Sequence, residues 1–244
     1  MHPRLQQDLD DLPRILDHTN QLAQGFLASL SQRPVCPPLA EQQLQTGDDR
    51  LAEEGCGALA ALEEFWQRYE AGLSGSAGPR YFGFVTGGST PAALAADWLV
   101  STADQNSQLS NDTVAAAIEL ATIEQLKTLL QLPTDFSGSF VSGATMANFT
   151  GIAIGRHWLG QQRGIDVAQL GLAALGPIQV LSANAHASSV KALSMLGIGR
   201  DALKSIASQA DCEAIDIEAL ERHLAATPDI PTIVLASAGT VNTG

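Results

Sequence analysis

The chain has 244 residues, in which 13 lysines and arginines face 26 aspartates and glutamates, for a formal net charge of −13. Binding to a nucleic-acid backbone requires clustered Lys and Arg, so this balance argues against a nucleic-acid partner. Hydrophobic residues make up 45% of the chain and aromatic residues 5%, which excludes collagen-like, disordered and disulfide-rich chains. The length fits one large domain or two smaller ones.

The cysteines and the first residues predict a cytoplasmic protein. Cys36, Cys56 and Cys212 are scattered without C-x-x-C spacing, which is typical of reduced thiols. Charged residues precede any apolar run at the amino terminus, unlike in a secretory signal. The uncharged stretch 136–155 has the length to cross a bilayer, but its serines and glycines would be costly in lipid. We expect this stretch in the protein interior, and no membrane partner.

Residues 1–76 are predicted to form an amino-terminal helical segment. Apolar residues recur at helical spacing over residues 3–31, and Pro13 predicts a kink within that run. A second helical run extends from about Arg50 to Tyr69, and the acid pair Glu53–Glu54 is expected on its solvated face. Because both runs are amphipathic, we expect their apolar faces to pack against the rest of the protein or a second subunit.

Residues 77–244 are predicted to form the first part of a large α/β domain. Continuous apolar runs predict strands, and segments of helical periodicity lie between them. This alternation favours a mainly parallel sheet that is covered by helices on both faces. The predicted strands are 138–142, 177–182 and 231–236, and the predicted helices are 111–130, 145–159, 188–196 and 215–226, the last with Asp216 as its cap.

The chain stops at Gly244, directly after the last predicted strand. In an open α/β sheet the functional residues follow the carboxyl ends of the strands. We therefore expect further parts of the domain beyond this point.

The segment Val141-Ser-Gly-Ala-Thr-Met-Ala-Asn148 is the strongest candidate binding motif. A strand is expected to enter a turn of small residues and to continue directly into a helix. The first turn of a helix exposes backbone N–H groups and the positive end of the helix dipole, which together bind a phosphate. Gly143 and Ala144 permit close approach, and the Thr145 hydroxyl adds a donor. A tight turn that binds nothing has the same pattern, so both interpretations stay open.

Three further segments carry candidate site residues. Asn184-Ala-His186 and Gly239-Thr240 each follow a predicted strand, so they are expected at one edge of the sheet. A lone histidine is most often a cap or a satisfied core residue, but this position favours a functional role. The segment 78–88, which places aromatic residues beside glycines, is either an ordinary entry to the core or a pocket wall.

Other catalytic motifs are excluded by their context. Gly197-Ile-Gly199 imitates a dinucleotide-binding turn, but it follows a predicted helix instead of a strand. The sequence has no Walker lysine, no His-Glu-x-x-His metal motif and no G-x-S-x-G nucleophile elbow. We therefore expect no metal site.

In combination and in this order, segments 79–88, 142–148, 184–190 and 239–244 resemble the pyridoxal-phosphate-dependent amino acid decarboxylases, the group that contains the aromatic-amino-acid, glutamate and diaminobutyrate decarboxylases. The resemblance extends from about Arg4 to Gly244. It implies the fold-type I, aspartate-aminotransferase-like architecture and pyridoxal 5'-phosphate as the cofactor. It also implies a homodimer whose early helices wrap the other subunit, and α-decarboxylation of an L-amino acid to an amine and CO2.

The same resemblance implies roles for individual residues at the cofactor. Thr145 and the backbone at Met146 and Ala147 would bind the cofactor phosphate, and family members often carry a second hydroxyl where this chain has Ala147. His186 would stack on the pyridine ring and act as the catalytic residue of this part of the chain. Thr240 would lie beside the cofactor.

For the substrate, the resemblance implies a second group of residues. Phe84, Val85 and Thr86 match the stretch that lines the substrate pocket in the family. Gly78 replaces the histidine with which the family opens this stretch.

The lysine that forms the Schiff base in the family, and the aspartate that pairs with the pyridine nitrogen, follow the strand at which this chain stops. Lys127, Lys191 and Lys204 do not match the lysine motif, and we assign the role to none of them. The resemblance therefore implies a complementary carboxyl-terminal chain or fragment as a partner. Two alternatives stay open: another pyridoxal-phosphate reaction, such as aminotransfer or aldehyde-forming deamination, and a non-catalytic cofactor-binding subunit.

Overall fold

The computed structural model describes residues 1–37, 53–105 and 113–241. The chain forms two compact units, Met1–Asp104 and Gln105–Gly244, which are described separately below. The domain division that the sequence predicts between residues 76 and 77 stays a prediction.

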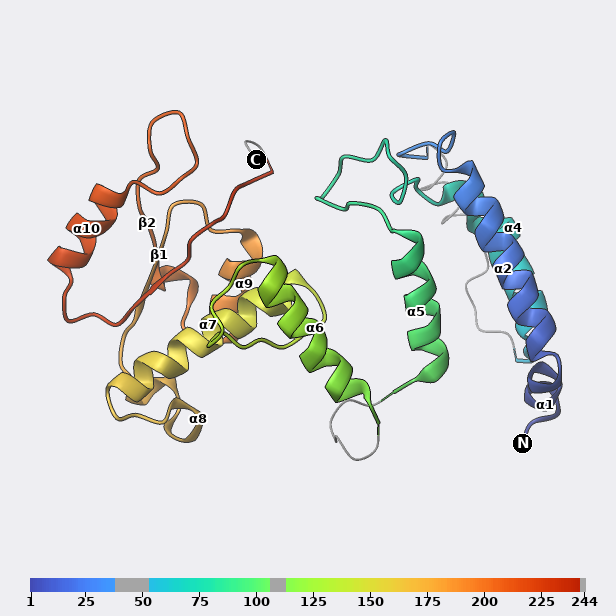
Figure 1. Ribbon diagram of the computed structural model, residues 1–244, viewed down its shortest axis with the longest axis horizontal. Helices are drawn as coiled ribbons and strands as arrows, with labels where there is room; N and C mark the ends of the chain where they lie inside the picture. The colour runs from blue at the N-terminus through green and yellow to red at the C-terminus, as the bar shows by residue number, and fades with distance from the viewer. Residues whose placement is uncertain (38–52, 106–112, 242–244) are drawn as a thin grey trace. The chain divides into compact units, whose positions relative to one another are not determined.

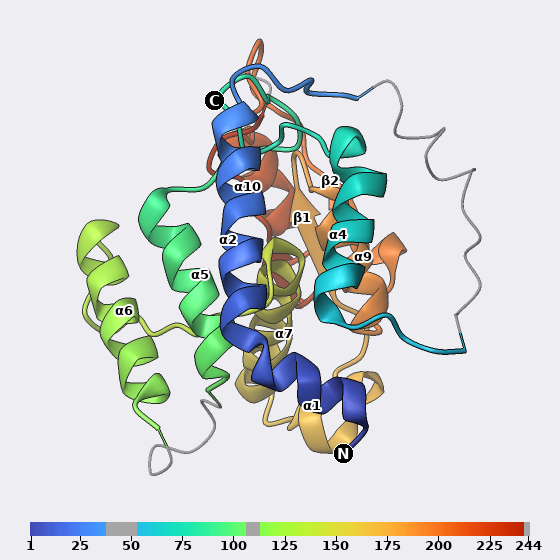
Figure 2. The same ribbon diagram turned by 90° about the vertical axis from the view of Figure 1, so that its right-hand side faces the viewer.

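The first unit is helical in its described part. It contains α1 (Pro3–Asp10), α2 (Leu12–Ser29), α4 (Ala58–Tyr69), a short 3-10 turn η1 (Glu70–Gly72) and α5 (Pro91–Ala103). The predicted kink is confirmed, because the run breaks at Asp11 and Pro13 lies in the first turn of α2, where a missing N–H costs nothing. α2 and α4 lie side by side (Figure 2), and the ring of Phe26 meets that of Trp66 edge-on at 6.1 Å.

The second helical run starts later than the sequence predicts. Helix α4 begins at Ala58, so the acid pair Glu53–Glu54 precedes it and the expectation that these residues lie on the helix is wrong. Gly57, just before α4, has a φ of 89°, which is outside the helical region. Residues 50–52 of the predicted run lie outside the described residues.

A buried arginine ties the end of α2 to η1. The guanidinium of Arg33 donates to the carbonyl oxygen of Glu70 at 2.9 Å and to Oγ of Ser29 at 3.1 Å, and it pairs with the Glu70 carboxylate. It also lies over the ring of Phe26 at 4.3 Å. Loss of this side chain would leave the carboxylate unpaired in a partly buried place, so we regard Arg33 as a structural residue.

The second unit contains a parallel sheet and its covering helices. Its helices are α6 (Ala115–Leu129), α7 (Ala144–Gln162), α8 (Val167–Leu170), α9 (Ala187–Met195) and α10 (Ile217–Ala226), with short 3-10 turns η2 (Leu172–Ala174) and η3 (Arg200–Ala202). Its strands are β1 (Gln179–Ser182), β2 (Leu203–Ser205) and β3 (Thr232–Val234). The strand order is β2-β1-β3, and Val180 at the centre pairs with Leu203 and Ile233 in parallel register.

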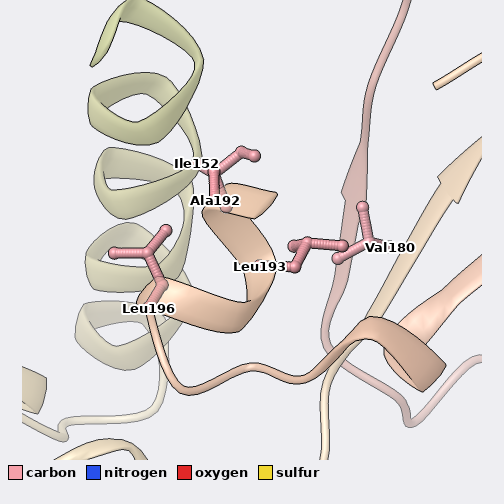
Figure 3. Close-up of a cluster of buried hydrophobic side chains, with 5 residues drawn as sticks. All are labelled: Ile152, Val180, Ala192, Leu193 and Leu196. Carbon is pink, nitrogen blue, oxygen red and sulfur yellow. The ribbon is translucent and has the colours of Figure 1, made fainter. Parts of the chain in front are cut away.

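Helices cover both faces of this sheet, as the sequence predicts. On one face, Val180 packs against Ile152 of α7 and Leu193 of α9 (Figure 3). On the other face, His223 of α10 contacts the side chain of Gln179, with 3.0 Å between Nε2 and Oε1. Figure 1 shows α10 on one side of the strands and α7 with α9 on the other.

The core of the second unit lies between the sheet and the helices α7 and α9. Val180, Ala192 and Leu193 have no exposed surface, and Ile152 and Leu196 are almost fully buried. Burial of a Val, Leu or Ile side chain contributes roughly 1.5–3 kcal/mol each. This cluster therefore fixes the positions of α7 and α9 relative to β1.

Two predictions for the second unit are wrong. Residues 138–142 are extended but pair with no described strand, and the backbone N–H of Phe140 donates to Oε1 of Glu119 instead (3.1 Å). Phe136 and Phe140 are each about half exposed, so the stretch 136–155 is not wholly interior in this chain. None of the described helices combines the length and the apolar character that crossing a bilayer requires.

Candidate functional site

The candidate site lies where the parallel strands end. Three segments leave this carboxyl edge: residues 183–186 after β1, 206–216 after β2 and 235–240 after β3. The helices that follow β1 and β2 cover opposite faces of the sheet, so these segments diverge. In open α/β sheets ligands bind at such a divergence.

Small polar side chains hold two of these segments together. Ser182 donates from Oγ to the carbonyl oxygen of Leu235 at 2.9 Å, and Ser237 donates to that of Asn184 at 3.3 Å. A pocket of about 210 Å³ opens at this edge, lined by these four residues and by Gln209, Glu213 and Ile215, among others. These two hydrogen bonds hold the segment after β3 against β1 and against the segment that carries His186.

The first turn of α7, residues 144–147, forms a cradle of exposed backbone and hydroxyl donors. The helix starts after Gly143, whose φ of 127° is strained for any other residue, and a side chain at that position would meet no atom within 4 Å. No described side chain caps this end, so the N–H groups of Ala144, Thr145 and Met146 have neither a cap nor an intrahelical acceptor. Thr145 and Ala147 are exposed and Met146 is half-buried. The donors and the open space fit a phosphate group.

His186 is connected to this cradle by hydrogen bonds. Asn148, one turn after Thr145 on α7, donates from Nδ2 to Oγ of Ser188 at 2.8 Å. Oγ of Ser188 lies 2.7 Å from Nδ1 of His186, and the Ser188 backbone N–H donates to the same nitrogen at 3.2 Å. Nδ1 therefore acts as an acceptor, which places the proton of the neutral ring on Nε2. His186 is the N-cap of α9, and its ring is exposed at the edge.

Thr240 lies at the same edge and contacts a residue that the sequence did not single out. Its hydroxyl donates to the carboxylate of Glu213, and both residues are half-buried. The backbone carbonyl of Glu213 also accepts from Nδ2 of Asn184 at 3.0 Å. No motif marks Glu213, because it lies in the loop after β2, a strand that the sequence did not predict.

Phe84, Val85 and Thr86 belong to the first unit and form a strained turn there. Phe84 and Val85 have φ values of 54° and 59°, and the Thr86 N–H donates to the carbonyl of Gly83 at 3.3 Å. A positive φ is a genuine outlier for a β-branched residue, and such strain concentrates at functional sites. Phe84 is 91% exposed and Val85 is 77% exposed, so the turn presents apolar surface.

Comparison with known protein families decides which family the chain belongs to. Residues 42–244 match the pyridoxal-dependent decarboxylase conserved domain, which is most of the chain. The chain belongs to the pyridoxal-dependent decarboxylase family. The predicted family and fold type are confirmed.

Relatives within this decarboxylase family are similar over much of the chain. An L-2,4-diaminobutyrate decarboxylase from Rhizobium meliloti (strain 1021) is 30% identical over 200 residues, which are 80% of this chain and 38% of the relative. An aromatic-L-amino-acid decarboxylase from Bacillus atrophaeus is 29% identical over 173 residues, 68% of this chain and 33% of the relative. The chain thus spans well under half of each of these decarboxylases.

Solved structures of decarboxylases share the fold. The Oryza sativa TDC structure with PLP has a TM-score of 0.81 at 20% identity, and the match covers 95% of this chain and 52% of that one. The glutamate decarboxylase domain of a Vibrio parahaemolyticus protein has a TM-score of 0.76 at 19% identity, over 94% of this chain and 51% of that one.

The lysines of this chain are engaged away from the cradle or exposed. Nζ of Lys127, on α6, donates to Oε1 of Glu124 and to the carbonyl of Thr134, both at 2.9 Å. Nζ of Lys204 donates to the carbonyl of Asp201 at 2.9 Å, and Lys191 is exposed on α9. The expectation that none of them forms the Schiff base stays a prediction.

Proposed function

We propose that this chain is the amino-terminal part of a pyridoxal 5'-phosphate-dependent enzyme that converts an L-amino acid to an amine and CO2. The observation that carries the proposal is the first turn of α7, an uncapped set of N–H donors beside open space. Membership of the pyridoxal-dependent decarboxylase family supplies the reaction class.

The α7 cradle would hold the cofactor phosphate. The backbone N–H groups of Thr145 and Met146 are open donors at the start of α7, whereas the N–H of Ala147, also expected at the phosphate, already donates to the carbonyl of Gly143 at 3.0 Å. The Thr145 hydroxyl adds a donor whose hydrogen bond to a charged group is worth about 1.5–3 kcal/mol. The helix dipole adds a favourable interaction with the phosphate charge. Pyridoxal phosphate would supply the electron sink for the bond to the substrate carboxylate when it is bound.

His186 and Thr240 would set the position of the cofactor ring. The Asn148–Ser188–His186 hydrogen bonds hold the histidine ring in one tautomer and orientation. A ring held in this way can stack on an aromatic cofactor with little entropy left to lose. Phe84, Val85 and Thr86 would line the substrate pocket, where the strained turn presents apolar surface.

The proposal requires a carboxyl-terminal portion that carries a Schiff-base lysine and an aspartate for the pyridine nitrogen. Its support is that the chain spans 38% of the Rhizobium meliloti relative and that no lysine lies in the cradle among the described residues. We also propose a homodimer, because Leu5, Leu9 and Leu16 of α1 and α2 expose large parts of their side chains. The exposed free cysteines support a reducing, cytoplasmic setting.

The test uses the protein expressed with any carboxyl-terminal portion that its gene encodes. Cofactor binding is followed by absorbance during titration of the apoprotein with pyridoxal phosphate. CO2 release is then measured with L-2,4-diaminobutyrate, glutamate and aromatic amino acids in turn. CO2 release in step with amine formation supports the proposal, whereas substrate consumption without CO2 excludes decarboxylation.

Thr145→Ala tests the cradle itself. Loss of one hydroxyl donor to a charged phosphate should weaken pyridoxal phosphate affinity about tenfold. Thr122→Ala, which removes an exposed hydroxyl from α6, is the matched control and should leave the affinity unchanged. Equal affinities of Thr145→Ala and the unmutated protein would argue against the phosphate site.

A further inference from the structure

The loop between β2 and α10 forms a third wall at the carboxyl edge. The N–H of Ile206 donates to the carbonyl of Ser182 at 3.0 Å, so the loop starts alongside β1. An antiparallel bridge between Ser208 and Ile215 then closes the loop into a hairpin, in which the Gln209 N–H donates to the carbonyl of Ala214 at 2.9 Å. These bonds join backbone atoms of the hairpin.

Glu213 joins this hairpin to both of the other strand-end segments. Its backbone carbonyl accepts from Asn184, two residues before His186, at 3.0 Å. Its carboxylate accepts from the hydroxyl of Thr240, which follows β3. Glu213 therefore contacts both segments that carry the residues expected at the cofactor ring, His186 and Thr240.

We propose that Glu213 is a positioning residue that sets the orientation of the Thr240 hydroxyl in the cofactor site. The inference rests on the proposed function, in which Thr240 lies beside the cofactor. The backbone bonding of β3 to β1 ends with the Leu235 N–H, which donates to the carbonyl of Leu181 at 2.8 Å, so the strand ladder does not extend to Thr240. A hydrogen bond to an ionised acceptor is about twice as strong as a neutral one, which is enough to select one rotamer of Thr240.

The carboxylate also determines what Thr240 can do chemically. An ionised carboxylate accepts hydrogen bonds and donates none, so the Thr240 O–H is committed to Glu213. Within this pair Thr240 is the donor and Glu213 the acceptor, so the carboxylate sets the direction in which the Thr240 O–H points.

The test measures pyridoxal phosphate affinity of the protein, with any encoded carboxyl-terminal portion, for Glu213→Ala and Thr240→Val singly and together. We expect Glu213→Ala to weaken affinity about tenfold, which equals ~1.4 kcal/mol. In the Thr240→Val background the same change should have no further effect, because Glu213 acts through Thr240. Glu213→Gln keeps an acceptor oxygen at the same place and should recover most of the affinity. Glu221→Ala, which removes an exposed carboxylate from α10, should change nothing.

The outcomes separate the inference from the proposed function. If Glu213→Ala weakens affinity equally with and without Thr240, or does not change it, the positioning role is overturned. If the unmutated protein binds no pyridoxal phosphate, or Thr145→Ala leaves its affinity unchanged, the proposed function itself fails. The bound cofactor's circular dichroism provides a second readout, since a hydroxyl that turns away from the ring should change it while a loss of general stability should not.

Discussion

Helices α7 and α9 start side by side and are linked by the Asn148–Ser188 hydrogen bond, yet their first turns differ. The first turn of α9 is satisfied within the chain, because the His186 side chain accepts from the Ser188 N–H. The first turn of α7 has no such acceptor among the described residues. Of these two adjacent helix ends, the one at α7 therefore has the N–H groups with which an external anion could pair.

The same contrast holds across the described part of the second unit. Thr113 provides a hydroxyl acceptor for the start of α6, Asp166 caps α8 and Asp216 caps α10. The longest of these helices, α7, has no side-chain acceptor at its first turn, and α6 has one only from Thr113, the residue before its N-cap Val114. An uncapped first turn leaves N–H groups without an acceptor, and the proposed phosphate site depends on these groups.

Gly143→Asp should have the largest effect on cofactor binding, because it would give the open first turn of α7 a side-chain cap like those of its neighbours. An aspartate at a φ of 127° strains the turn, and its carboxylate would compete with the phosphate for the same N–H groups. We expect pyridoxal phosphate affinity to fall about 100-fold, consistent with roughly 1–3 kcal/mol of strain plus repulsion. Titration of the apoprotein measures it.

Gly164→Asp is the matched control, since Gly164 lies just beyond the other end of α7 with a φ of 66° and open space around it. Aspartate tolerates this left-handed conformation, so affinity should hardly change. A comparable loss of affinity in both variants would mean that the first turn of α7 has no special role.

His186 variants separate capping from catalysis at the neighbouring helix. His186→Ala should cost about 0.5–2 kcal/mol of stability through loss of the α9 cap and should also lower turnover about tenfold through loss of ring stacking. Asparagine is a preferred cap, so His186→Asn should restore the melting temperature but not the turnover. If both recover together, His186 is a structural cap and no more.

The sequence predicted the helices of the second unit well because each carries local signals. The cap Asp216 and the continuous apolar runs of β1 and β3 are visible in a few neighbouring residues. β2 was missed because Leu203-Lys-Ser205 has no strand pattern, and its position depends on pairing with β1, a contact distant in sequence. The strand predicted at residues 138–142 was wrong for the converse reason. These residues have an apolar strand pattern, but no described strand pairs with them.

The candidate site was predictable in its residue types but not in its connections. Gly143, Thr145 and His186 follow from motif and position, whereas the hydrogen bonds of Ser188 and Glu213 join segments that are far apart in the chain. Capping of α9 by His186 was one of the two readings that the sequence left open, and the structure shows that this histidine does cap the helix. Its stacking role stays a prediction.

Asp216→Ala should have the smallest effect on cofactor binding, because it removes a cap from α10 and leaves the first turn of α7 intact. Its carboxylate accepts from the Ala219 N–H at 3.1 Å at the start of α10, on the opposite face of the sheet from α7. Loss of this cap should cost about 1 kcal/mol, or roughly 2–4 °C in melting temperature, while pyridoxal phosphate affinity stays unchanged. Asp216→Asn, which still caps, should melt like the unmutated protein. A fall in affinity in proportion to the loss of stability would mean that cofactor retention follows the overall stability of the fold. The open first turn of α7 would then have no particular role in binding the cofactor.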